Sequence, residues 1–190
     1  MRMKSVFIIA FLFVTTIAFS KGEINYEHKS IDKTLVKTCK LVNPVLHEVS
    51  IPHTLENAST LQGKFFTIKS DNTDSNLSHL YIGRVNSCRA GGCSRPGATP
   101  LGESEYFDYM ACYNGAGEVI LIKVFNYQAS HGYEVTAKGW LKQFIGYSSE
   151  QNLEVGDNID SISGATISVN GITADIKQKT ALLKTIIGQS

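Results

Sequence analysis

The sequence lacks an excess of charge of either sign and has no internal repeat. Its 190 residues include 18 Lys and Arg against 17 Asp and Glu, a formal net charge of +1. A dedicated nucleic-acid-binding protein needs clustered Lys and Arg to neutralise phosphates, so this balance argues against such a function. With 43% hydrophobic residues, the chain is neither a disordered tail nor a collagen. Its length is that of one folded domain with a short appendage.

Acidic residues are absent from the first twenty positions, which have the pattern of a secretory signal. Arg2 and Lys4 precede an apolar run, and Ala18-Phe19-Ser20 supplies the small residues that a signal peptidase reads. As a helix the run would extend about 22 Å, less than the roughly 30 Å of a bilayer core. We therefore expect a signal peptide at residues 1–20 and an exported, periplasmic or extracytoplasmic protein folded as a single domain over residues 21–190. An N-terminal membrane anchor is the alternative.

Cysteine is scarce, and its spacing disfavours several kinds of site. The chain has four Cys and no Cys-x-x-Cys-His, so a covalent c-type haem is not supported, and a zinc site would need a second close pair. Cys88 and Cys93 enclose a Gly-rich loop and are expected to form a small structural disulfide. A pair that cycles between dithiol and disulfide is the alternative. Cys39 and Cys112 either pair with each other or remain buried thiols.

Hydrophobic periodicity predicts an α+β fold, a twisted and mainly antiparallel sheet with flanking helices. Strands are expected at 64–69, 79–85, 105–113 and 118–127. Helices are expected from Ser30, as N-cap, to a stop at Asn43-Pro44, and at 135–145 and 169–188. Residues 86–102 are rich in Gly, Pro, Ser and Thr and are predicted to form a loop. Residues 114–117 form a hairpin turn between two strands, the second of which is apolar on both faces and is predicted to lie in the centre of the sheet.

The segment from Asp160 to Thr166 precedes the C-terminal helix and is the best candidate for a functional site. Gly164 and Ala165 let a ligand approach the backbone, and a hydroxyl at a helix N-terminus can meet an anionic phosphate. A simpler interpretation is that Ser163 or Thr166 caps the helix and Gly164 makes the turn. Residue types alone favour the cap.

This segment resembles a known flavin-attachment motif. Asp160, Ser163, Gly164, Ala165 and Thr166, followed by Ser168, reproduce Asp-x-x-Ser-Gly-Ala-Thr-x-Ser. The sequence is similar to the FMN-binding domain family, which includes the flavin-carrying subunits of the bacterial sodium-pumping NADH:quinone reductase and of Rnf-type complexes. The resemblance implies that a flavin transferase uses FAD as donor to join FMN to the Thr166 hydroxyl through a phosphoester. The other motif residues would form the sequence that the transferase recognises.

The resemblance extends over about residues 104–188. The family loop at this place reads roughly His-x-Glu-Thr-Pro-Gly-Leu-Gly. The segment here begins with His131, and Glu134 matches the Glu, but Thr136 is displaced by one residue and the Pro-Gly-Leu-Gly is missing. Tyr127, Tyr133 and Trp140 are further candidates for contact with the flavin ring, and Trp140 with Phe144 is equally typical of a core pair.

The resemblance predicts an exported electron-transfer flavoprotein. Its partner would be a membrane-bound or extracytoplasmic redox protein, and a substrate site of its own is not implied. The alternative is a non-catalytic secreted binding domain with structural disulfides.

Overall fold

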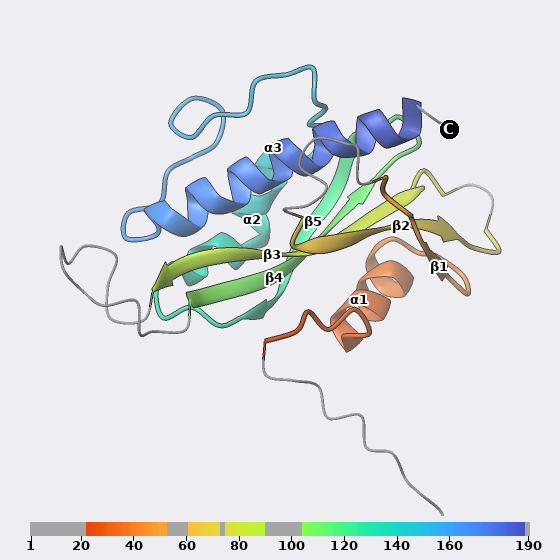
Figure 1. Ribbon diagram of the computed structural model, residues 1–190, viewed down its shortest axis with the longest axis horizontal. Helices are drawn as coiled ribbons and strands as arrows, with labels where there is room; N and C mark the ends of the chain where they lie inside the picture. The colour runs from red at the N-terminus through yellow and green to blue at the C-terminus, as the bar shows by residue number, and fades with distance from the viewer. Residues whose placement is uncertain (1–21, 53–60, 73–74, 90–103, 189–190) are drawn as a thin grey trace, which may run out of the picture.

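The protein is a five-stranded antiparallel sheet covered by helices on both faces (Figure 1). The computed structural model describes residues 22–52, 61–72, 75–89 and 104–188. The strands follow one another in chain order across the sheet as β1 (Val45–Glu48), β2 (Gly63–Lys69), β3 (His79–Arg89), β4 (Ser104–Tyr113) and β5 (Val119–Tyr127). The predicted α+β class is confirmed. The expected signal peptide at residues 1–20 lies outside the described residues.

The four predicted strands are present, but two expectations about them were wrong. The loop predicted from residue 86 begins later, because β3 continues to Arg89, with Asn86 opposite Tyr106 and Arg89 opposite Ser104. The long partner strand β4 supplies hydrogen bonds that local composition does not reveal. β5 lies at an edge of the sheet and not at its centre. Its two apolar faces reflect helices on both sides of the sheet, which cover an edge strand as effectively as a central one.

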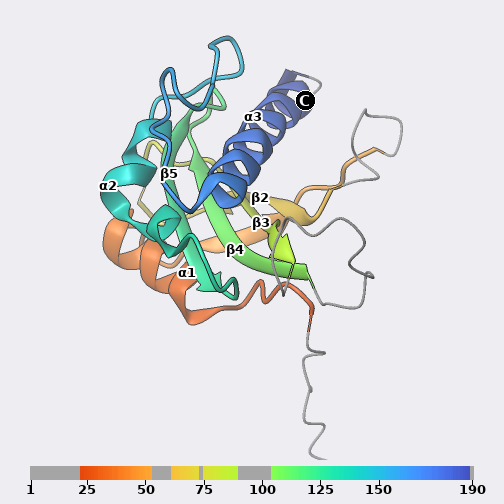
Figure 2. The ribbon, with the colours of Figure 1, turned by 90° about the vertical axis from the view of Figure 1, so that its left-hand side faces the viewer.

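The C-terminal helix α3 (Thr166–Gly188) crosses one face of the sheet, as Figure 2 shows. The predicted apolar face of this helix is confirmed, since Val169, Ile172, Ile176 and Leu183 are all buried. They pack in one core with side chains from alternate strand positions, among them Tyr81 and Tyr109. Within the described residues, the helices contain no stretch long and apolar enough to cross a membrane.

Two shorter helical regions complete the fold. The opposite face of the sheet is covered by α1 (Lys29–Lys33) and the π-helical turn η1 (Thr34–Thr38), which bury Ile31 and Leu35. The N-cap of α1 is His28, whose Nδ1 accepts the Ser30 N–H, so the predicted cap at Ser30 was wrong by two residues. The middle helix is broken into η3 (Tyr133–Thr136), α2 (Lys138–Leu141) and η4 (Lys142–Phe144).

Cys39 and Cys112 are free thiols. Cys112 is buried in β4, Cys39 is half-buried after η1, and the two are not at disulfide distance. Of the two alternatives for this pair, the structure shows the thiols. The predicted disulfide between Cys88 and Cys93 involves side chains that the structure does not describe.

Candidate functional site

Thr166 is the first residue of α3, and its side chain is exposed. The first helical hydrogen bond runs from the Val169 N–H to the Ala165 carbonyl, at 2.9 Å. The N–H groups of residues 166–168 therefore have no acceptor within the helix. Together with the macrodipole of a 23-residue helix, they create positive potential beside the Thr166 hydroxyl. Such a helix start favours a phosphate group.

The hydroxyl groups of the motif do not cap this helix. The N-cap position is taken by Ala165, which has no side-chain acceptor. Among the described residues, the hydroxyls of Ser163 and Thr166 have no hydrogen-bond partner. Gly164 has a φ of +79° and open space where a side chain would be, so it turns the chain into the helix and leaves access to the next residues. The capping interpretation is therefore not supported by the geometry.

The loop after β5 packs directly against the motif. Gly132 has a φ of +86°, and a Cβ at this position would lie 2.8 Å from the Ser168 Oγ and 3.3 Å from the Ala165 Cβ. Ser168 is buried, and its Oγ lies 2.8 Å from the Oγ of Ser87 on β3. Ser168 thus ties the start of α3 to the sheet, and the missing side chain of Gly132 allows the loop to approach.

A cavity of about 240 Å³ lies at this junction. It is lined by Ser87, His131, Gly164, Ala165, Thr166, Ile167 and Ser168. Five of the predicted site residues are therefore brought together. Ser163, Asp160 and Glu134 are exposed and do not line it.

The predicted residues outside the cavity have defined positions. Asp160 is held through its backbone, since its carbonyl accepts the Trp140 Nε1–H at 2.9 Å and its N–H donates to the Gln143 Oε1 at 2.8 Å. Trp140 is 9% exposed and packs edge-on against Phe144, with ring centroids 5.3 Å apart. Trp140 and Phe144 therefore belong to the core that supports the motif. Glu134 lies in the first turn of η3.

An aromatic surface adjoins the cavity at His131. Tyr133 is 67% exposed and meets Tyr127 edge-on at 5.3 Å, and Tyr127 stacks on Phe107 at 5.5 Å. The Tyr127 hydroxyl donates to the His131 carbonyl, which fixes the loop to the strand. The exposed ring of Tyr133, nearly perpendicular to that of Tyr127, offers apolar surface to a ring that leaves the cavity.

Sequence reasoning missed two contributors to this site. Ser87 lies at the end of β3, in the segment predicted to be a loop, and no sequence signal pairs it with Ser168. Glu105 accepts the Ser130 hydroxyl at 2.6 Å, and the Ser130 Oγ lies 3.0 Å from the His131 Nδ1. This series of hydrogen bonds orients His131 through Ser130 and Glu105, which are 25 positions apart in the sequence. Local sequence patterns do not reveal a contact between residues so far apart.

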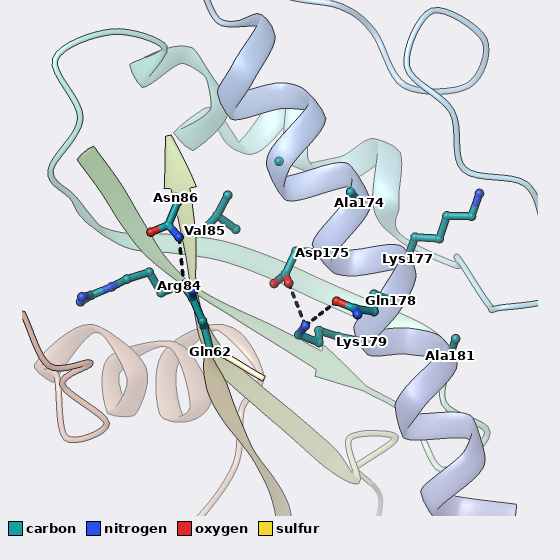
Figure 3. Close-up of a pocket in the computed structure, with 11 residues that line it drawn as sticks. Gln62, Arg84, Val85, Asn86, Ala174, Asp175, Lys177, Gln178, Lys179 and Ala181 are labelled. Carbon is teal, nitrogen blue, oxygen red and sulfur yellow. Dashed lines mark hydrogen bonds and ion pairs between the residues drawn. The ribbon is translucent and has the colours of Figure 1, made fainter. Parts of the chain in front are cut away.

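A larger cavity of about 670 Å³ lies further along α3, between the helix and β3 (Figure 3). A buried ion pair lines it, with the Lys179 Nζ 3.0 Å from the Asp175 Oδ1. The Tyr109 hydroxyl donates to the other Asp175 oxygen at 2.7 Å. Burial raises the pKa of the Asp175 carboxyl, against the lowering effect of Lys179 and of the Tyr109 hydrogen bond. This cluster lies apart from the residues of the motif.

Replacing Gly132 with alanine tests the contact between loop and motif. We expect Gly132→Ala to lower the free energy of unfolding by about 1–3 kcal/mol, because the Cβ meets Ser168 and the left-handed backbone is strained. Gly139→Ala is the matched control, since nothing lies within 4 Å of its added Cβ. Alanine should stabilise that helical position by about 0.5–1 kcal/mol. Urea unfolding measures both, and an equal effect at the two glycines would contradict the close approach.

Part of this chain, including the Thr166 segment, is similar to a known protein family. The model of the FMN-binding domain family matches residues 105–180, which include β4, β5, the loop with His131 and the first four turns of α3. None of the curated proteins compared with the chain matches it. The family match and the resemblance of the Thr166 segment to the flavin-attachment motif are found in the same part of the molecule. Residues 105–180 therefore match the FMN-binding domain family, and this match supports flavin binding by that part of the chain.

Proposed function

We propose that the protein carries FMN in a phosphoester bond to the Thr166 hydroxyl and transfers electrons outside the cytoplasm. The observation that carries the proposal is the state of this hydroxyl. It is exposed and unpartnered among the described residues, and it stands beside unpaired N–H groups at the positive end of a long helix. A threonine needed only for helix capping would be hydrogen-bonded to the backbone.

In the attachment reaction, one bond to phosphorus forms and one breaks. The Thr166 Oγ forms a bond to the flavin-side phosphorus of FAD, and the bond between that phosphorus and the bridging oxygen breaks. AMP leaves, and the hydroxyl proton passes to solvent. A flavin transferase performs this reaction. The chain's contribution is to present Thr166 on an accessible turn, with Gly164 leaving open space next to it.

After attachment, the same residues hold the phosphate. The free N–H groups of residues 166–168 stabilise its charge. The cavity of about 240 Å³ is smaller than the roughly 300–1,000 Å³ of pockets that enclose a whole ligand. A covalent tether makes deep enclosure unnecessary, so the ring can lie outside the cavity on the surface formed by Tyr127 and Tyr133.

The flavin supplies one- or two-electron chemistry when bound. We assign no catalytic residue, and the function is that of an electron carrier with a membrane-bound or extracytoplasmic redox partner. The chain would reach that compartment through the signal expected at residues 1–20. The alternative of a non-catalytic binding domain assigns no role to the unpartnered Thr166 hydroxyl.

Intact mass spectrometry of the full chain tests this function. Co-expression with an active flavin transferase is expected to add the mass of one FMN less one water, and the purified protein should be yellow after denaturation. Expression without the transferase provides the matched control, with no added mass. An unmodified chain in the presence of an active transferase would refute covalent attachment, and a protein that binds no flavin under either condition would refute the flavoprotein itself.

A further inference from the structure

A second cavity, of about 280 Å³, lies at the free edge of β5, away from the flavin site. It is formed between η1, β5 and the α2–η4 segment, and Figure 2 shows α1 and α2 on the same side of the molecule beside β5. It shares no lining residue with the cavity at Thr166. Its lining combines apolar side chains with three lysines, Lys123, Lys138 and Lys142.

Lys123 is the fixed member of this group. Its Nζ donates to the Thr34 Oγ1 at 2.7 Å and lies 3.5 Å from the Ser30 carbonyl oxygen. Both partners are neutral, so they orient the ammonium group without compensating its charge. Burial lowers the pKa of Lys123, and the positive charges of Lys33 and Lys138 lower it further. A negative charge in the cavity would relieve this repulsion.

The lysines of this cavity differ from others in the fold. Lys64 pairs with Glu48, Lys179 with Asp175 and Lys184 with Glu150. In the part of the chain that the structure describes, the three cavity lysines form no salt bridge, and no acidic side chain lines the cavity. This is a local excess of positive charge in a chain whose total is close to neutral.

The rest of the lining is suited to hydrocarbon. Leu121, Val124, Leu141 and Ile145 contribute apolar surface, and Ile145 is 51% exposed. A large exposed apolar side chain next to several cations does not favour a free inorganic anion, which would gain nothing from that surface. It does favour an anion attached to an apolar body.

We propose that this cavity binds an anionic amphiphile, a phosphate or carboxylate group on a hydrocarbon chain. The three lysines receive the head group, and the apolar residues cover the first part of the chain. The volume is slightly below the range of pockets that enclose a whole ligand, so the rest of the hydrocarbon remains outside. The site is independent of the flavin proposal, because it uses neither Thr166 nor its neighbours.

Isothermal titration of the full chain with dodecyl phosphate, below its micelle concentration, tests the proposal. We expect one molecule to bind per chain, with inorganic phosphate and the neutral dodecyl maltoside both much weaker. Lys138→Gln/Lys142→Gln should weaken binding about 30-fold, because each lysine near an anionic group contributes a factor of about five. Both side chains are exposed, so this variant is expected to fold. Lys123→Gln should weaken binding as well.

The matched control is Lys69→Gln/Lys177→Gln, which removes the same charge from exposed positions on β2 and α3. It should leave the affinity unchanged. Equal weakening by the two double variants, equal binding of the neutral detergent, or no binding of dodecyl phosphate would each overturn the proposal. Sedimentation with phosphatidylglycerol vesicles, compared with phosphatidylcholine vesicles, distinguishes a membrane lipid from a soluble amphiphile as the ligand of this cavity. Binding that depends on Lys138 and Lys142 identifies a membrane lipid, and binding of the free amphiphile alone identifies a soluble ligand.

Discussion

Thr166→Ala is expected to abolish covalent flavin attachment completely. Alanine has no hydroxyl to form the phosphoester, and no other group of the chain is required to react. The substitution lies at an exposed first position of α3, where alanine is a good helix former, so the free energy of unfolding should change by no more than about 0.5 kcal/mol. Intact mass after co-expression with the transferase should show only the unmodified chain.

The matched control is Thr185→Ala, at an exposed threonine on the same helix. This variant should keep the full FMN mass, because Thr185 lies about five turns along the helix from the motif and its hydroxyl donates to the Ala181 carbonyl. Thr166→Ser retains a hydroxyl and should retain at least partial attachment. If Thr166→Ala still gains the mass of FMN, the attachment site is another residue, and peptide mapping would identify Ser163 or a different hydroxyl.

Lys179→Met is expected to have the largest effect on stability. Lys179 is buried, and its removal leaves the Asp175 carboxylate without its ion-pair partner. Breaking a buried pair from one side costs about 3–5 kcal/mol, whereas replacing both members can be nearly neutral. Urea unfolding at neutral pH measures the loss, and Asp175→Asn/Lys179→Met should recover much of it.

The stability lost in Lys179→Met should be smaller at low pH than at neutral pH. Burial raises the pKa of Asp175 in the folded protein, so folding favours its protonated form, and stability falls as pH rises from the unfolded-state pKa to the folded one. Lys179 lowers the pKa of Asp175. Without Lys179 the folded-state pKa is higher, so the decrease in the free energy of unfolding continues to higher pH. Lys179→Met should therefore be less destabilising at pH 4 than at pH 7.5.

Lys177→Met controls for the loss of a lysine, because Lys177 is exposed on the same helix and points away from Asp175 (Figure 3). It should change the free energy of unfolding by no more than about 0.5 kcal/mol at either pH. A loss in Lys179→Met that is the same at both pH values would contradict an ionised Asp175 as its cause.

Much of the fold could be predicted because its signals are local. The apolar spacing of Val169, Ile172 and Ile176 predicts the buried face of α3, and the Asn114–Gly117 turn predicts the β4–β5 hairpin. β1 could not be predicted, since four residues with a weak pattern become a strand only through pairing with β2. For the same reason, sequence placed the end of β3 too early.

The position of β5 shows a limit of a different kind. Apolar residues on both faces of a strand report that both faces are covered, and they say nothing of what lies in the plane of the sheet. The strand order depends on how long-range pairs form, which periodicity does not contain. An edge position also creates the lysine-lined cavity, because one side of β5 is left for η1 and α2 to border.

The sequence by itself determined the fold class, the C-terminal helix and the motif that ends at Thr166, because helical spacing and a dense short motif are properties of neighbouring residues. Only the tertiary structure decided which hydroxyls of that motif are free. Ser168 is bound to Ser87, which is 81 positions away, while Thr166 remains exposed. Only the fold brings Gly132 against Ala165 and Ser168. Those contacts depend on packing between distant segments, and the energies that select them arise only when the core forms.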